Sequence, residues 1–177
     1  IYASANNLYL ATRHWWSWPA IGQEDTTYIH KFDITQPSQA VYLASGTVAG
    51  HIVDQFSLDE SAGGHLRVVT TVNRRVPDTQ NPQNTWGTIE TVNRLSVLAQ
   101  ERDALTVVGL SPDLAKGERV MSSRMIGDKG FVVTFRQIDP LFTFDLSDPT
   151  SPRVVGELKI PGFSTYMHPL DADHLLT

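Results

Sequence analysis

A strand-like unit recurs along the chain, and this recurrence constrains the fold more than any other feature of the sequence. Short segments rich in Val, Thr, Ile, Phe and Tyr alternate with turns of Gly, Pro, Asn and Asp, which is the pattern of β-strands. Related segments begin at Leu8, Leu66, Phe131 and His174. Their spacing, about 40 to 65 residues, is typical of a four-stranded β-propeller blade.

Four types of segment follow one another in each unit. The segments LYLAT, LRVVTT, FVVTF and HLLT are of the first type, and the complete copies are followed by YIHKFDI, NRLSVLA and LFTFDLS, then by VYLASG, LTVVGL and RVVGELKI. The last type, HIVDQFSL, RVMSSRMI and FSTYMHPL, leads into the acidic turns SLDESAGG, IGDKG and PLDAD. The sequence therefore predicts an all-β fold: a partial β-propeller of antiparallel four-stranded blades, with about three blades' worth of chain.

The same repeat predicts how the chain is divided. We expect a single β-propeller fragment with a partial blade over residues 1–48, complete blades over 49–112 and 113–161, and the start of a further blade over 162–177. Such an arc does not close a ring, because propellers usually have about four to eight blades. Strand edges and apolar faces at its ends would be exposed, so self-association through the end blades is expected.

One turn occurs at the same place in two units. The segments 32–39 and 144–152 share the frame F-D-[IL]-[ST]-x-P. The carboxylates of Asp33 and Asp145 are predicted to accept hydrogen bonds from backbone amides two residues further on, and the prolines pre-set φ for the turn. Strand alternation also predicts part of the core, since packed sheets bury alternate residues. The residues expected to be buried are Phe56, Val69, Val108, Val133, Phe135, Phe144 and Val155.

Composition excludes several classes of function. Fourteen Lys and Arg against nineteen Asp and Glu give a net charge of -5, which argues against a nucleic-acid partner. The absence of cysteine excludes disulfides, thiolate metal sites and a cysteine nucleophile. No apolar run approaches the length of a membrane span. No G-x-S-x-G, P-loop or G-x-G-x-x-G motif occurs, so we expect no cofactor and name no catalytic residue.

Two irregular insertions interrupt the strand pattern. Residues 13–25 and 73–91 are predicted to form long loops on one rim, where repeat folds usually place variable binding surface. The first insertion carries three tryptophans and a flanking arginine, residue types that dominate binding interfaces. The candidate residues for binding a protein or a glycan are Trp15, Trp16, Trp18 and Arg13. The alternative is a loop that folds its own aromatic side chains onto the blade edge.

Polar residues on the last segment type form a second candidate site. Gln55, Arg124 and Tyr166 stand at equivalent positions, each directly before an apolar residue. If those apolar neighbours pack between blades, the three polar residues should face the central channel or the adjoining blade. Such a position suits a small-molecule site, but a merely hydrated channel wall gives the same pattern.

The segment HPLDADH is a candidate metal site. It holds His168, Asp171, Asp173 and His174, a set that is able to bind a divalent cation. The equivalent segments in the other units are acidic turns, however. We therefore expect turn capping here, and no metal.

Several stretches resemble a known family. TYIHKFDI, VYLASGTVAGHIVDQFSLDE, LRVVTT and the run from Gly117 to Leu170 resemble the bacterial secreted β-propeller domain family distantly related to WD40 repeats. The resemblance implies a secreted, periplasmic or cell-envelope location and supplies no established activity. It favours a non-catalytic platform that binds or scaffolds a protein or glycan through its rim loops. The alternative is part of a propeller enzyme whose active site needs blades beyond this segment.

Overall fold

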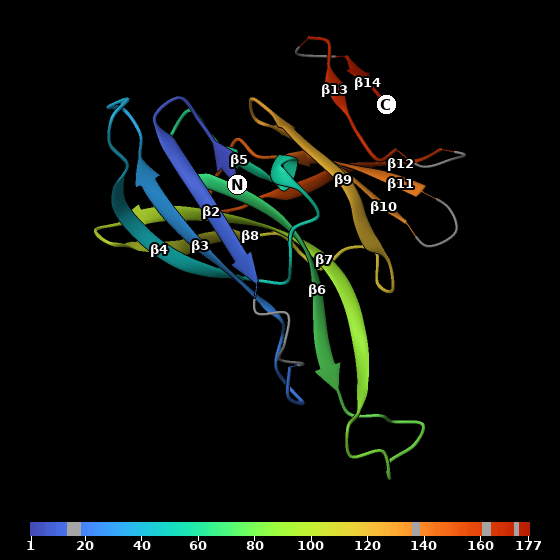
Figure 1. The fold of residues 1–177 in the computed structure, drawn as a ribbon. Helices are drawn as coiled ribbons and strands as arrows, with labels where there is room; N and C mark the ends of the chain where they lie inside the picture. The colour runs from blue at the N-terminus through green and yellow to red at the C-terminus, as the bar shows by residue number, and fades with distance from the viewer. Residues whose placement is uncertain (14–18, 136–138, 161–163, 172–173) are drawn as a thin grey trace.

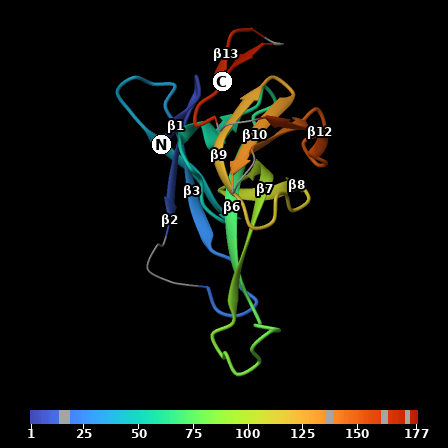
Figure 2. The same ribbon diagram turned by 90° about the vertical axis from the view of Figure 1, so that its right-hand side faces the viewer.

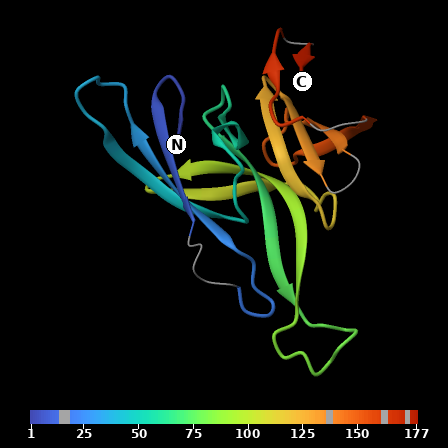
Figure 3. The ribbon, with the colours of Figure 1, turned by 45° about the vertical axis from the view of Figure 1, so that its right-hand side comes forward.

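The all-β fold of antiparallel strands is confirmed by the computed structural model, which describes residues 1–13, 19–135, 139–160, 164–171 and 174–177. Three sets of four strands follow one another along the chain and stand side by side in Figure 3. In Figure 2 the loop over residues 77–87 and the C-terminal hairpin lie at opposite ends of the molecule. The three sets thus follow one another in space as they do along the chain.

The first set contains four antiparallel strands, of which the repeat predicted only the last three. Their bounds are β1 (Tyr2–Ala3), β2 (Asn7–Arg13), β3 (Thr26–Asp33) and β4 (Val41–Ala49). The additional strand β1 pairs Tyr2 with Tyr9. Two residues are too few to show any alternation, so no sequence pattern predicted this strand.

The second set follows a 3-10 helix. It consists of η1 (Gln55–Ser57), β5 (Leu58–Glu60), β6 (Leu66–Val76), β7 (Thr88–Glu101) and β8 (Ala104–Leu110). Strands β4 and β8 pair in parallel, which joins both sets into one sheet of order β1-β2-β3-β4-β8-β7-β6-β5. This approach requires Gly46, because a Cβ there would lie 2.1 Å from the carbonyl oxygen of Leu105.

The third set is a separate sheet of order β12-β11-β10-β9. Its strands are β9 (Arg119–Ile126), β10 (Lys129–Phe135), β11 (Asp139–Asp145) and β12 (Arg153–Ile160). A two-stranded hairpin of β13 (His168–Pro169) and β14 (Leu175–Leu176) ends the chain (Figure 1).

The middle set is buried on both faces. Successive residues of β6 point to opposite sides, so Val68 joins the core on the side of the first set and Val69 the core on the side of the third. The first core contains Tyr9, Ile29, Ala44, Val48, Leu58, Leu66, Val68, Leu98 and Leu105. The second contains Val69, Leu95, Val97, Val120, Met125, Val132, Phe142, Phe144 and Leu146.

The predicted Asp turns are confirmed. Asp33 accepts a hydrogen bond from the amide of Thr35 at 2.8 Å, and Asp145 accepts one from the amide of Ser147 at 3.0 Å. Hydrogen bonds from Ser147, together with one from Arg153, lower the pKa of Asp145 to about 2. The two turns therefore hold their shape with ionised carboxylates.

The burial predictions are only partly correct. Val69, Val133 and Phe144 are buried, whereas Phe56, Val108 and Phe135 are half-buried. The prediction for Val155 is wrong, because 62% of its surface is exposed. Among the described strands, β12 pairs with β11 alone and forms the edge of its sheet. Alternation along a strand identifies its two faces, but it does not show whether anything covers them.

Two segments also differ from the expected pattern. HIVDQFSL was predicted as a strand, but Asp54 accepts hydrogen bonds from the amides of Phe56 and Ser57 and starts η1 instead. The insertion 73–91 was predicted as a loop throughout. Instead, β6 and β7 continue as a paired ladder up to Val76 and Thr88, so only residues 77–87 form the loop. This extended hairpin projects from the body of the molecule in Figure 1.

Phe144 and Val155 give a direct test of this packing. Replacing Phe144 by Ala should cost about 3 to 5 kcal/mol in free energy of unfolding, because its ring is 1% exposed within the second core. Val155→Ala should change it by less than about 0.5 kcal/mol. Urea unfolding measures both, and equal losses would contradict the assignment of β12 as an uncovered edge.

Candidate functional site: a rim built from two insertions

The two insertions come together along one edge of β6. Strand β5 covers this edge only as far as Val68. Beyond Val68, the amide of Thr71 donates a hydrogen bond to the carbonyl of His51 at 2.9 Å, and the amide of Arg75 donates one to the carbonyl of Gln23 at 3.1 Å. Residues 19–25 therefore continue the sheet beside the extended hairpin. We call residues 19–25 and 74–91 together the rim.

Arg75 ties the two parts of the rim to each other. Its Nε donates to the carbonyl of Pro19 at 2.8 Å, and its Nη1 donates to the carbonyl of Trp86 at 2.7 Å. The turn into β7 depends on Gly87, which has a φ of 67° and whose added Cβ would lie 2.2 Å from the carbonyl oxygen of Val76. The backbone around Trp86 is thereby held in one arrangement.

The outer part of the rim exposes large apolar side chains. Trp86 is 76% exposed, Ile21 45% and Ile89 39%. A hollow of about 430 Å³ lies between the two insertions, lined by Pro19, Ala20, Ile21, Arg75, Thr85 and Trp86. A fixed, exposed Trp beside a shallow apolar hollow is the kind of anchor that protein interfaces use.

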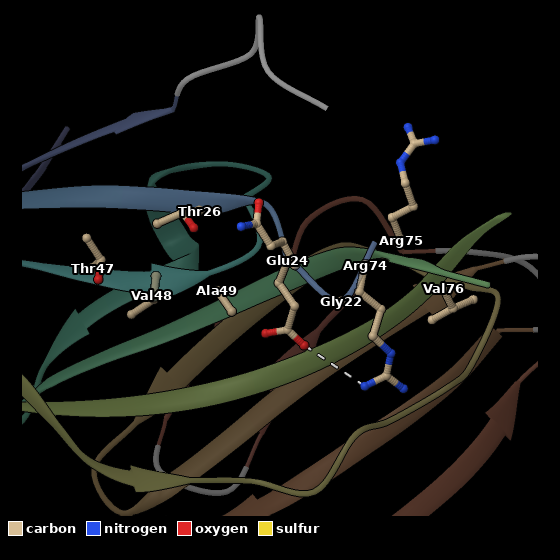
Figure 4. Close-up of a pocket in the computed structure, with 10 residues that line it drawn as sticks. Gly22, Glu24, Thr26, Thr47, Val48, Ala49, Arg74, Arg75 and Val76 are labelled. Carbon is tan, nitrogen blue, oxygen red and sulfur yellow. Dashed lines mark ion pairs between the residues drawn. The ribbon is translucent and has the colours of Figure 1, made fainter. Parts of the chain in front are cut away.

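A second hollow, of about 620 Å³, lies between the end of β4 and residues 22–24 (Figure 4). Figure 4 shows Glu24 and Arg74 reaching toward each other, with 4.0 Å between Nη1 and Oε1, whereas Arg75 points the other way. Thr47 and Val48 of β4 form its opposite side.

A network of alternating charges supports the base of the rim. Arg94 bonds both carboxylate oxygens of Glu24 at 2.8 Å and also pairs with Asp113. Arg74 pairs with Asp113 at 3.2 Å and with Glu90. Glu90 is also paired with Lys116, and the hydrogen bonds from Lys116 and Arg74 lower the pKa of Glu90. Three acids and three bases balance, so the network fixes the rim without giving it a net charge.

A buried carboxylate joins the rim to the first set of strands. Asp25 is 8% exposed and accepts hydrogen bonds from Arg13 at 3.0 Å, from His51 at 3.1 Å and from the amide of Asn73 at 2.7 Å. Burial alone would raise the pKa of Asp25, but the hydrogen bonds from His51 and Asn73 outweigh it and lower this pKa. Arg13, a predicted binding residue, thus has its guanidinium bonded to Asp25.

Trp15, Trp16 and Trp18 fall outside the described residues. Within HPLDADH, His174 Nδ1 lies 2.8 Å from Asp171 Oδ1, whose carboxylate also accepts from the His174 amide, and this is a capped turn. Asp173 is outside the described residues, and the described ones contain no group of three or more His, Asp or Glu placed to bind a metal.

The predicted channel residues meet only in part. Arg124 lies against the ring of Tyr166, with 5.5 Å from the guanidinium carbon to the ring centroid. Gln55 is exposed at the start of η1. Two residues that the sequence suggested for other roles complete the cluster, Phe56 as a core residue and His168 as a metal ligand. Phe56 contacts both Arg124 and Tyr166, and the His168 ring stacks on Tyr166.

Comparison with known proteins agrees with the architecture. The model of the β-propeller domain family matches residues 1–177, so the chain belongs to this family, and the partial propeller predicted from the repeat is confirmed. An uncharacterised protein of Methanocaldococcus jannaschii is 42% identical over 71% of this chain and 18% of its own length. An uncharacterised protein of Archaeoglobus fulgidus is 40% identical over 86% of this chain and 21% of its own length.

This chain therefore spans about a fifth of the curated relatives it matches. Both relatives are archaeal, so they lend no support to the bacterial source that the resemblance implied. No solved structure matches the chain. Across the described ranges, no helix has the length and apolar character needed to cross a membrane.

The buried Asp25 carboxylate should make stability depend on pH. Because its pKa is lowered in the folded state, its contribution is complete above the ordinary Asp pKa of about 3.9 and is lost as the pH falls through the lowered value. Asp25→Asn should therefore cost about 1 to 3 kcal/mol at pH 7, and the difference from wild type should narrow below about pH 4. Urea unfolding across this pH range measures it; a difference that widens in acid would contradict the assignment.

Proposed function

We propose that this domain is a non-catalytic binding platform whose partner docks on the rim. The observation that carries the proposal is Trp86, 76% exposed yet on a backbone fixed by Arg75 and Gly87. An exposed aromatic ring contributes no burial free energy to folding, whereas Trp and Arg supply much of the binding free energy of protein interfaces. A rigid rim also loses little entropy on binding.

The surroundings of Trp86 favour a protein over a glycan as the partner. Ile21 and Ile89 add apolar surface on the same rim, and the hollow beside the Trp is lined mainly by apolar groups. Such a surface suits an apolar side chain of a partner. A glycan would stack on the Trp ring but would need polar side chains around it.

The carboxylates of the fold support a non-catalytic role. Glu60 accepts hydrogen bonds from Asn7 at 2.8 Å and from Tyr9 at 2.9 Å, and also from Ser4. Burial would raise the pKa of Glu60, but these hydrogen bonds lower it. The pKa values of Asp25 and Glu90 are lowered as well, so each of the three carboxylates is an ionised hydrogen-bond acceptor. A general base, by contrast, works best with a pKa near the operating pH. The alternative, an enzyme completed by further blades, would need other groups.

We further propose a secreted, periplasmic or cell-envelope location, which the family resemblance supports. A binding platform with a fixed apolar rim suits an envelope or external partner. Fractionation of cells that produce the parent protein tests this; recovery in the cytosolic fraction alone would exclude it.

Replacing Trp86 by Ala should abolish capture of the partner while leaving the unfolding midpoint nearly unchanged, because the ring is mostly in solvent. Tyr42→Ala is the matched control, since Tyr42 is 51% exposed on β4, away from the rim. The combined replacement of Trp15, Trp16 and Trp18 by Ala tests the first insertion in the same way. Pull-down from envelope extracts and a glycan array measure binding; capture that survives Trp86→Ala would refute the rim as the docking surface.

Self-association through the end sheets stays a prediction. The exposed Val155 and Leu158, at 62% and 57%, give the edge strand β12 an apolar surface that a second copy would cover. Light scattering coupled to size exclusion should then show a dimer that weakens on dilution. A monomer at high concentration would contradict it.

A further inference from the structure

Three segments far apart in sequence converge on Arg124. Strand β9 forms the edge of the third sheet, and its Ser123 hydroxyl lies 3.2 Å from the hydroxyl of Ser57 in η1. On the other side, the Ser122 hydroxyl donates to the carbonyl of Ser164 at 2.7 Å. β9 therefore lies between η1 and the segment that leads into β13. β9 begins the third set and η1 leads into β5, which begins the second, and the blades of a propeller surround a central channel.

The guanidinium of Arg124 is held in one orientation. Its central carbon lies 4.1 Å from the centroid of the Phe56 ring and 5.5 Å from that of Tyr166. Nε donates to the carbonyl of Met167 at 3.0 Å. The Phe56 and Tyr166 rings contact each other at 5.4 Å between centroids, edge to face. Two aromatic rings and one carbonyl thus fix the plane of the cation without neutralising it.

The remaining nitrogens of Arg124 differ from those of three arginines elsewhere in the fold. Arg67, Arg74 and Arg94 each pair with a carboxylate. Within the residues that the structure describes, Arg124 makes no such pair, and neither Nη atom has an acceptor. A guanidinium stays charged at any physiological pH. Its Nη edge is therefore a fixed pair of donors next to the exposed side chains of Tyr166 and His168.

We propose that Arg124, Phe56, Tyr166 and His168 form a binding site for an oxyanion, the carboxylate or phosphate group of a small ligand. The two Nη donors match two oxygens of such a group, a geometry that lysine does not offer. The Tyr166 hydroxyl, 3.4 Å from His168 Nδ1, adds a polar atom on the open side. The site is separate from the rim, since the hairpin of β13 and β14 and the loop 77–87 lie at opposite ends in Figure 1.

The test is titration of the protein with sodium phosphate and, separately, with sodium acetate at constant ionic strength, followed through the backbone amide NMR signals of residues 166–168, which every variant retains. We expect a saturable shift with a dissociation constant in the millimolar range, as suits one fixed cation. Arg124→Lys keeps the charge and should weaken binding at least about tenfold, since it removes the paired donors. Tighter binding of phosphate or of acetate identifies the preferred group.

Two further variants keep the test decisive. Arg153→Lys changes an arginine that already pairs with Asp145 at 2.8 Å, and it should leave the affinity unchanged. Tyr166→Phe removes only a hydroxyl, so it should fold and should weaken binding less than Arg124→Lys does. Loss of affinity that is equal in Arg124→Lys and Arg153→Lys would show unspecific charge attraction and overturn the proposal. So would the absence of a saturable shift with either anion.

Discussion

The open edge of β6 is the constraint on which the rest of the molecule depends. Past Val68, the amides of Thr71, Asn73 and Arg75 face away from β7 and need acceptors, because an unpaired strand edge invites other chains. The chain just after β4 supplies the carbonyl of His51, and the first insertion supplies the carboxylate of Asp25 and the carbonyl of Gln23. Covering this edge joins the first two sets and places the first insertion beside the second.

The middle set is buried on both faces because the third set packs directly against it. β6 is almost continuously buried from Leu66 to Val72, as expected for a strand covered on both faces. Two polar side chains of the middle set bond to the start of the third set: the Thr71 hydroxyl of β6 accepts from the amide of Val120 at 2.9 Å, and Asn93 of β7 donates to the carbonyl of Glu118 at 3.2 Å. Neighbouring sheets are therefore held together by directional bonds as well as by apolar contact.

The sequence predicts what is local and misses what depends on distant partners. The turns at Asp33 and Asp145 were predictable because each carboxylate bonds an amide two residues away. The presence of two rim insertions was predictable from the break in alternation. Their place on one rim was expected as well, but the contacts that join them were not, because Arg75 bonds Pro19 and Trp86, residues that no pattern relates. For the same reason the sequence pointed to Arg124 and Tyr166 but not to Phe56.

The two candidate sites follow from different uses of arginine in one fold. Arg75 donates hydrogen bonds to backbone carbonyls and Arg94 pairs with carboxylates, so both hold the rim in place. Arg124 is oriented by aromatic rings and one carbonyl, which fix the cation and leave its Nη edge without an acceptor among the described residues. Arg75 and Arg94 thus hold in place the rim proposed to bind a protein, whereas the oriented edge of Arg124 is available to the proposed oxyanion. The two proposed sites lie in separate parts of the fold.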